Sequence, residues 1–382
     1  MLHSWRNLYP GSRSSYESLL MARNILHGQV KRVKLNRPSH LPYLSDFFCT
    51  SGHTPGDPDE QVGITKGKAR AKTRKETMKG NVSAATVIEN SSHRDGSIYK
   101  NSCLDVCRVK NRAETQLEPM MLSDPVDCFP DRRRCCLHFV SDMMQIFSLK
   151  LAKVPNNASS IQLYGYIAAR DFLDNSLNYI VNRSRDNSFT VRQGSLIEMT
   201  GPKRGITMTC AVLVEYDMRV KNGEQEEDDL QLIDGATDFS EVTTPSVPFM
   251  NRINGDYGAV DITLARVVNA VEATIDVIIS EVQGGFSLSL SSFVIVGGVR
   301  QGIELFHDII GESCVLTKRH VIAVEMDSWM HLKLKIGQKG FKNDDLERYC
   351  RFKADIHGCA RRQIMLEHAS ILLKVTWSAL PP

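Results

Sequence analysis

The sequence has 382 residues, 42% of them hydrophobic, and a net charge of +3, which indicates a folded protein of about two to three domains. Such a small net charge gives no sign of a polyanionic partner, and no run of about 18 apolar residues predicts a membrane span. The charge is unevenly spread, because residues 1–140 hold 22 Lys and Arg against 14 Asp and Glu, whereas residues 141–382 hold 25 against 30.

The first third of the chain predicts little ordered structure. Residues 51–80 are rich in Gly, Pro, Thr and charged residues and have almost no large apolar side chain, and such a segment cannot bury enough surface to offset its ordering entropy. The basic run Lys66–Lys75 is interpreted as a solvated tail, with a nuclear signal or a phosphate contact as the alternative. We predict that residues 1–135 are a low-order basic segment and linker, largely disordered and removable.

Cysteines are concentrated in this first third. The pair Cys103 and Cys107 and the group Cys128, Cys135, Cys136 and His138 invite a zinc hypothesis, but only the first pair has the usual ligand spacing. Free thiols are therefore favoured over a metal site. The chain does not begin with a secretory signal pattern, so we expect reduced thiols and a cytoplasmic, alternatively nuclear, location.

Residues 141–380 are predicted to form one β-rich domain. The clearest strand starts at Val271 and is followed by Gly284-Gly285, a pair that suits a two-residue hairpin turn. Alternate side chains of a strand point to opposite faces, so we expect a buried and a solvated face. The buried set is Val271, Ala273, Ile275, Val277 and Ile279, and the solvated set is Glu272, Thr274, Asp276 and Ser280.

Similar alternation predicts short strands through the rest of this region, with one short helix expected over residues 302–310. The expected strands lie near residues 147–151, 161–167, 207–214, 230–233, 258–268, 321–326, 332–336, 352–356 and 371–377. Short links between consecutive strands favour antiparallel pairing. The predicted fold class is mainly β, an antiparallel β-sandwich or open barrel preceded by a largely disordered N-terminal third.

Charged turns are the only binding candidates that the residues suggest. Gly201–Gly205 is a compact turn with Lys203 and Arg204 at its tip, and two adjacent cations on a stiff turn could hold an anion. Arg183 and Arg185, in a second segment at a strand end, could join the same patch. An ordinary turn remains the alternative. The acidic run Glu224–Asp229 lacks calcium-loop spacing and predicts a solvated loop.

Ten stretches of the strand-rich region carry a family resemblance. They are Met144–Lys153, Tyr164–Asp171, Asn182–Asp186, Gly201–Gly205, Glu215–Arg219, Asp229–Gly235, Gly258–Asp261, Val271–Asp276, Ser289–Phe293 and Trp377–Ser378. In this order they resemble a cereal-grass domain of unknown function, which also occurs C-terminal to the toxin domain of some ribosome-inactivating, jasmonate-induced-type proteins. The resemblance implies no catalytic residue.

No catalytic set appears in the sequence, so we expect neither an enzyme nor a cofactor or metal. The toxin's adenine-removing site would need an Arg where Asp276 stands, and rRNA N-glycosylase activity is not expected. We expect a non-enzymatic interaction module, linked through the resemblance to stress or defence, with an unidentified protein partner, RNA as an alternative, and no membrane. The alternative is a β-protein that binds carbohydrate or RNA or acts as a hydrolase, with a cleft gathering His331, Asp327 and Asp261. The sequence leaves the oligomeric state open.

Overall fold

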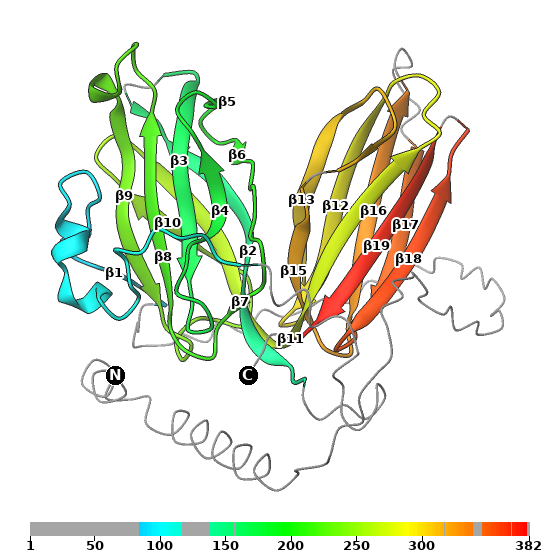
Figure 1. The fold of residues 1–382 in the computed structure, drawn as a ribbon, viewed down its shortest axis with the longest axis horizontal. Coiled ribbons are helices and arrows are strands. Elements are labelled where there is room, and N and C mark those ends of the chain that lie inside the picture. Colours follow the sequence, from blue (N-terminus) through cyan, green and yellow to red (C-terminus); the bar gives the residue numbers. More distant parts are fainter. Residues whose placement is uncertain are drawn as a thin grey trace, which may run out of the picture. The chain divides into compact units, whose positions relative to one another are not determined.

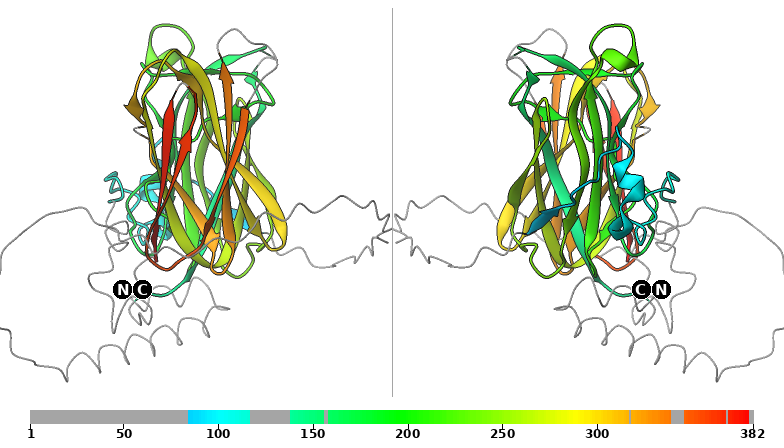
Figure 2. Two further views of the ribbon diagram at one scale, coloured as in Figure 1. Left: turned by 90° about the vertical axis from the view of Figure 1, so that its right-hand side faces the viewer. Right: turned by 90° about the vertical axis from the view of Figure 1, so that its left-hand side faces the viewer.

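The computed structural model describes residues 84–116, 138–155, 158–316, 318–338, 346–367 and 369–379. These residues belong to one compact unit, Met78–Pro382. The strands form three sheets, and every pairing between named strands is antiparallel, as Figures 1 and 2 show. The prediction of a mainly antiparallel β fold is confirmed, while the expected disorder of residues 1–83 lies outside the described residues.

The first sheet has six strands in the order β1-β9-β8-β3-β4, with β5 paired to β3. Their bounds are β1 Ala85–Val87, β3 Ile161–Arg170, β4 Asn178–Arg183, β5 Phe189–Val191, β8 Val212–Val220 and β9 Leu230–Phe239. Three short 3-10 helices accompany them, η1 Ser97–Lys100, η2 Ser102–Leu104 and η6 Glu226–Asp228.

The second sheet has nine strands around β11, which spans Ala259–Ser280. Its main order is β18-β19-β11-β2-β6; β10, β14 and β15 also pair with β11, and β7 pairs with β2. The bounds are β2 Ser141–Lys153, β6 Leu196–Ile197, β7 Ile206–Thr207, β10 Phe249–Asn254, β14 Cys314–Val315, β15 His320–Glu325, β18 Gly358–Met365 and β19 Ser370–Ser378.

The third sheet has four strands in the order β13-β12-β16-β17, drawn in gold and orange in Figure 1. They are β12 Phe286–Val296, β13 Val299–Ile310, β16 Trp329–Gln338 and β17 Leu346–Lys353. Residues 302–310 were predicted to be helical, but they lie in β13. A register shift between Leu290 and Ser291 leaves Leu305 as an extra residue in β13, so the apolar side chains no longer alternate strictly.

Two large hydrophobic cores hold these sheets together, and β11 contributes side chains to both. Val260, Ile262 and Leu264 lie in the core that also contains residues of β3, β8 and β9. Directly after Leu264, Ala265 belongs to the other core, which contains residues of β12, β16 and β19. Successive side chains of a strand point to opposite faces, so one continuous strand serves two cores.

The predicted alternation of β11 holds on one face and fails in part on the other. The expected buried set, from Val271 to Ile279, is at most 1% exposed. The expected solvated set divides, because Asp276 and Ser280 are accessible whereas Glu272 and Thr274 are buried. Glu272 accepts hydrogen bonds from the Gly205 backbone N–H at 2.5 Å and from the Ser378 hydroxyl at 3.2 Å. A turn that covers this end of β11 therefore buries residues that alternation alone marks as solvated.

Residues 84–116 correct the prediction that all of residues 1–135 have low order. We call them the N-terminal segment; it lies in cyan against the green strands in Figures 1 and 2. β1 pairs with β9, and Ile98, Leu104 and Val109 form a small core with residues of β8 and β9. Three apolar anchors in more than thirty residues give too low an apolar density for a sequence-based prediction of structure.

The two faces of β11 give the first testable prediction. Replacing Ile275 with Asp places an unpaired carboxylate in a fully buried position and should cost about 4 kcal/mol of folding free energy or more. The matched change Asp276→Ala removes a half-buried carboxylate 3.4 Å from Arg319 and 3.7 Å from Lys374, and should change stability by no more than about 0.5 kcal/mol. Equal losses of folding free energy in the two variants, measured by urea denaturation, would contradict the placement of Ile275 in the core.

Candidate functional site

Arg204, predicted to stand exposed at the tip of a turn, is buried. Its Nη1 and Nη2 donate to the two carboxylate oxygens of Asp171 at 2.6 and 2.7 Å, and the side chain is 1% exposed. A bidentate pair with a carboxylate compensates the guanidinium for lost water, so this residue can fold inward. Lys203 remains partly exposed and pairs with Glu114 of the N-terminal segment.

Arg183 and Arg185 are also engaged within the chain. Arg183 pairs with Glu198 at 3.1 Å, and Arg185 pairs with Asp229 at 2.7 Å. The Lys203 backbone N–H donates to the Asn178 side chain at the first residue of β4, whereas Arg183 is the last residue of that strand. The structure therefore places the two pairs at opposite ends of β4 and does not bring them into one patch.

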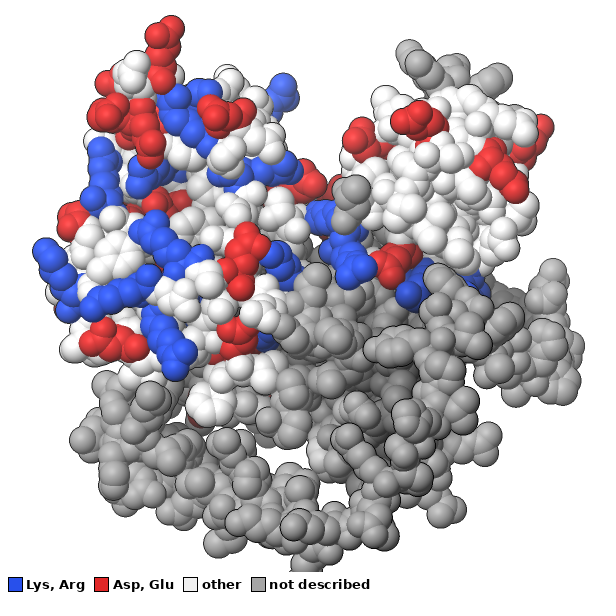
Figure 3. All heavy atoms as spheres, viewed as in Figure 1, with Lys and Arg blue, Asp and Glu red and all other residues white. Residues whose placement is uncertain are grey.

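The acidic run Glu224–Asp229 contains both exposed and buried side chains. Residues of η6 are exposed, and Figure 3 shows acidic side chains gathered where β8 and β9 are joined. Asp229 is instead buried. Burial opposes its ionisation, but hydrogen bonds from Arg185, Asn222 and Tyr164 outweigh burial and lower its pKa to about 2. Asp229 therefore fixes the loop, while the rest of the run is solvated as predicted.

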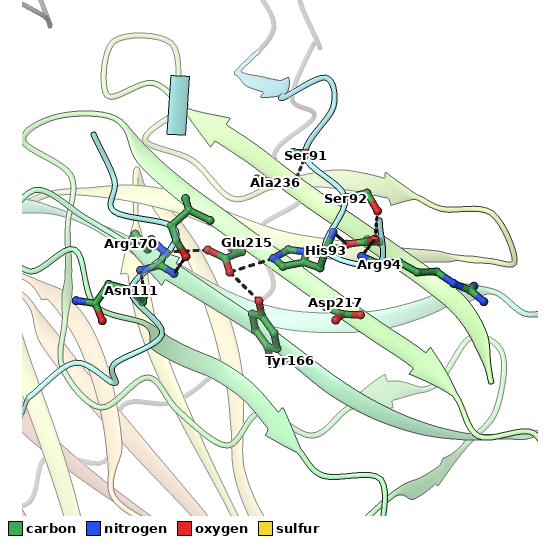
Figure 4. Close-up of polar contacts among 12 residues, drawn as sticks. Ser91, Ser92, His93, Arg94, Asn111, Tyr166, Arg170, Glu215, Asp217 and Ala236 are labelled. Carbon is green, nitrogen blue, oxygen red and sulfur yellow. Dashed lines mark hydrogen bonds and ion pairs between the residues drawn. The ribbon is translucent and has the colours of Figure 1, made fainter. Parts of the chain in front are cut away.

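A buried polar network lies beneath the N-terminal segment, and Figure 4 shows its side chains converging on Glu215 of β8. Glu215 Oε1 accepts a hydrogen bond from the Tyr166 hydroxyl at 2.6 Å and lies 3.0 Å from His93 Nε2. Its Oε2 accepts from Arg170 Nε at 2.8 Å. Arg170 also donates to the backbone carbonyl of Asn111 at 3.0 Å, so sheet and segment share one network.

His93 continues this network to Asp234 of β9. Its Nδ1 lies 2.6 Å from Asp234 Oδ1, and the other carboxylate oxygen accepts from the Ser92 hydroxyl at 2.5 Å. Burial disfavours the imidazolium, but the bonds to Asp234 and Glu215 outweigh it and raise the His93 pKa to about 9. Burial also opposes the ionisation of Glu215 and Asp234, but hydrogen bonds from His93 and other donors outweigh it and lower the pKa of each carboxyl group to about 2.

This arrangement holds opposite charges against one another beneath the N-terminal segment. Both imidazole nitrogens are occupied, so His93 has no lone pair to act as a base. Burial and the Glu215 charge raise the pKa of Tyr166, which keeps the phenol protonated. Sequence reasoning missed the network because His93 lies in a segment of low apolar density. The only signal was a pair of opposite charges, Arg170 and Glu215, just beyond the ends of two predicted strands.

The outer face of the four-stranded sheet is the exposed feature that sequence reasoning left out. Its inner side chains, such as Leu290 and Leu334, lie in a core, so the alternate residues of each strand point outward. We call the basic and aromatic members of this outward set the basic aromatic face: Phe293, Arg300, Trp329, Lys333, Lys335, Tyr349, Arg351 and Lys353. Trp329 is 39% and Tyr349 59% exposed.

Cations lie over the aromatic rings of this face. Arg351 stands 5.0 Å from the Trp329 ring centre, Lys333 5.5 Å from that of Tyr349, and Arg300 4.3 Å from that of Phe293. Such contacts hold a cation above the negative face of a ring. Two carboxylates share this side of the sheet, Glu304 opposite Ser291 and Glu347, which pairs with Lys333 at 2.7 Å. Five cations against two carboxylates leave the face positive.

Two further sequence hypotheses have no corresponding arrangement in the described residues. Asp261 lies on β11 with both oxygens bonded to Arg252, whereas His331 lies on β16 opposite Phe293, so the suggested cleft does not gather them in one sheet. Of the zinc candidates, Cys103 is exposed and Cys107 is half-buried, while Cys128, Cys135 and Cys136 lie outside the described residues. Within the described part, no group of three or more His, Cys, Asp or Glu could hold a metal ion.

Fold and surface together define a β-sandwich protein with two cores and an exposed, positively charged sheet face. The family model described as Domain of unknown function (DUF6598) matches residues 143–376, and the chain belongs to this family. No curated protein matches it. Among the described residues, no helix has the length and hydrophobicity needed to cross a bilayer.

Solved structures give remote similarities. Human GIVD cytosolic phospholipase A2 with a fluorophosphonate inhibitor matches at 10% identity and a TM-score of 0.21, over 63% of this chain and 32% of that chain. The calcium-bound tandem C2 domains of Extended-Synaptotagmin 2 match at 7% identity and a TM-score of 0.23, over 64% of this chain and 99% of that chain. The chain thus spans about a third of the phospholipase, and neither likeness defines its fold or function.

The buried network predicts a pH-dependent attachment of the N-terminal segment. The His93 pKa is raised on folding, so its contribution is complete below about pH 6.5 and is lost as pH rises through about 9. A shift of this size corresponds to on the order of 3 kcal/mol. Hydrogen exchange of residues 84–116, corrected for intrinsic rates, should therefore accelerate between pH 6 and pH 9.5.

The variant His93→Gln is the control for this prediction. It keeps hydrogen-bonding groups but cannot become charged, so its exchange should be fast at both pH values. Equal protection of the wild-type segment at pH 6 and pH 9.5 would show that the His93 charge does not hold it.

Proposed function

We propose that this protein is a non-enzymatic interaction module that binds its partner through the basic aromatic face. One observation carries the proposal, the gathering of five cations and three aromatic rings on an exposed sheet face. Elsewhere, cations that looked available in the sequence, such as Arg204 and Arg185, are committed to internal carboxylates. Charge that contributes to binding has to be accessible, and Arg351 and Lys353 are exposed.

The chemistry of this face supports a binding role. Interface residues with the largest effect on affinity are commonly Trp, Tyr and Arg, and the face contains all three as neighbours on paired strands. β12 and β16 are each paired on both sides, and β16 holds the edge strand β17 along its whole length, so little backbone freedom is lost when a partner binds. The buried network around Glu215 has a different role in this proposal, since it ties the N-terminal segment to its sheet.

The cellular setting is part of the same proposal. Cys103, Cys107, Cys210, Cys314 and Cys350 are free thiols, which suits the reducing cytoplasm or nucleus. The stress or defence role implied by the family resemblance depends on the partner that the face binds.

Retention on a heparin column tests whether this face supplies the accessible positive charge. The double variant Arg351→Gln/Lys353→Gln should elute at clearly lower salt than the wild-type chain, because two exposed cations of the face are lost. The matched variant Arg192→Gln/Arg361→Gln removes two exposed cations from other strands and turns, and should elute close to wild type. Equal shifts for both variants would mean that only net charge matters and that the face has no special role.

A further inference from the structure

Resting on the proposed function, we infer that the partner of the basic aromatic face is single-stranded RNA. Three features of the face point to this ligand: exposed aromatic rings, cations beside them, and a row of hydroxyl groups on the neighbouring strand β12. Each corresponds to a different part of a nucleotide, namely the base, the phosphate and the ribose.

The stacking surfaces come from Trp329 and Tyr349. The ring of Phe293 is covered by Arg300 and lies close to Gly302, where an added Cβ would be only 3.1 Å from the ring. Trp329 and Tyr349 are the more exposed rings, on adjacent strands. Unpaired bases stack on aromatic rings and on guanidinium planes, and Trp329 with Arg351 5.0 Å from its ring centre supplies both groups.

The cations lie where the sugar-phosphate backbone of the RNA would pass. Across the paired strands, Lys353 lies opposite Trp329 and Lys333 lies opposite Tyr349. Lys335 and Arg351 are the next outward residues of β16 and β17. Along one strand face the side chains repeat at about 7 Å, which is close to the spacing of phosphates in an extended single strand. A base-paired helix would present its phosphates to the lysines but could not place bases on Trp329 and Tyr349, because its bases are stacked on each other.

The hydroxyl row distinguishes ribose from deoxyribose. Ser287, Ser289 and Ser291 point outward from β12, opposite Gly337, Lys335 and Lys333 of β16. Serine hydroxyls both donate and accept, so they can pair with the 2′-hydroxyl that only RNA carries. An acidic peptide would contact the cations and the rings, but it has neither a base to stack nor a 2′-hydroxyl to pair with this row.

Fluorescence anisotropy with a labelled 12-nucleotide oligouridine tests the inference on the full chain. RNA should bind more tightly than the same-length oligothymidine and than a fully paired RNA hairpin, and log affinity should fall with log salt with a slope of about −2 to −4. Tyr349→Ala should weaken RNA binding about tenfold, whereas Tyr257→Ala, a matched exposed tyrosine on another strand link, should leave it unchanged.

Intrinsic fluorescence gives a second readout that a merely electrostatic contact would not change. RNA should quench the exposed Trp329, and the quenching should disappear in Trp329→Phe while Trp377, buried in a core, is unaffected. Tyr349→Ala and Trp329→Phe both change side chains on an exposed face. Circular dichroism at matched temperature should therefore show that the sheet is intact in each variant.

The outcomes separate this inference from the proposed function. Binding of an acidic peptide or of anionic vesicles that is lost in Arg351→Gln/Lys353→Gln, without RNA binding, would overturn the RNA assignment and leave the interaction face in place. Equal affinity for DNA would also overturn it. RNA binding unaffected by Tyr349→Ala and Arg351→Gln/Lys353→Gln would overturn the face itself. Absence of binding to all these probes would overturn both.

Discussion

The architecture depends on β11, a strand of 22 residues that packs on both of its faces. Its early residues, such as Leu264, complete one core, and its later residues, such as Ile275, complete the other. In each half of the strand one face is buried, so a slip by one residue would exchange the apolar and polar sets, and the register is strongly fixed. The same register fixes β2, β15 and β19, which pair with it directly.

Buried charge has a structural role in this protein. Glu215 and Arg170, both almost fully buried, are bonded to each other and to the N-terminal segment. Arg204 and Asp171 form a second such pair. Burial raises the pKa of Glu272, which accepts hydrogen bonds from neutral donors. Breaking one side of a buried ion pair costs about 3–5 kcal/mol, so these side chains are poor candidates for reversible contact with a partner.

The alternation of apolar residues predicted most of the long strands, but it missed β13 and several other strands and did not predict what covers the sheets. The buried face of β11 was predicted residue by residue, because period 2 is a direct consequence of strand geometry. Glu272 and Thr274 were misassigned since the turn that buries them comes from residues nearly seventy positions earlier. The bulge at Leu305 adds one residue to β13 and shifts the period of its apolar residues, so this strand was predicted to be a helix.

The site was predicted less well, and for a related reason. Lys203 and Arg204 are adjacent in sequence, so they were recognised, but their partners Glu114 and Asp171 are distant and could not be assigned. The basic aromatic face, in contrast, is assembled from residues that are not adjacent in the sequence. Trp329, Lys333, Tyr349 and Arg351 lie on two strands and form a surface only after β16 and β17 pair. The register in which the two strands pair, which decides which side chains become neighbours, is not encoded in the local pattern of either strand.

Photo-cross-linking tests the central claim most directly. Single-stranded RNA containing 4-thiouridine would be bound to the full chain, irradiated, and the linked peptides identified by mass spectrometry. The account predicts cross-links in β16 and β17, at or beside Trp329 and Tyr349, and their loss in excess unlabelled RNA. Cross-links confined to the basic run Lys66–Lys75 or to the six-stranded sheet would contradict it.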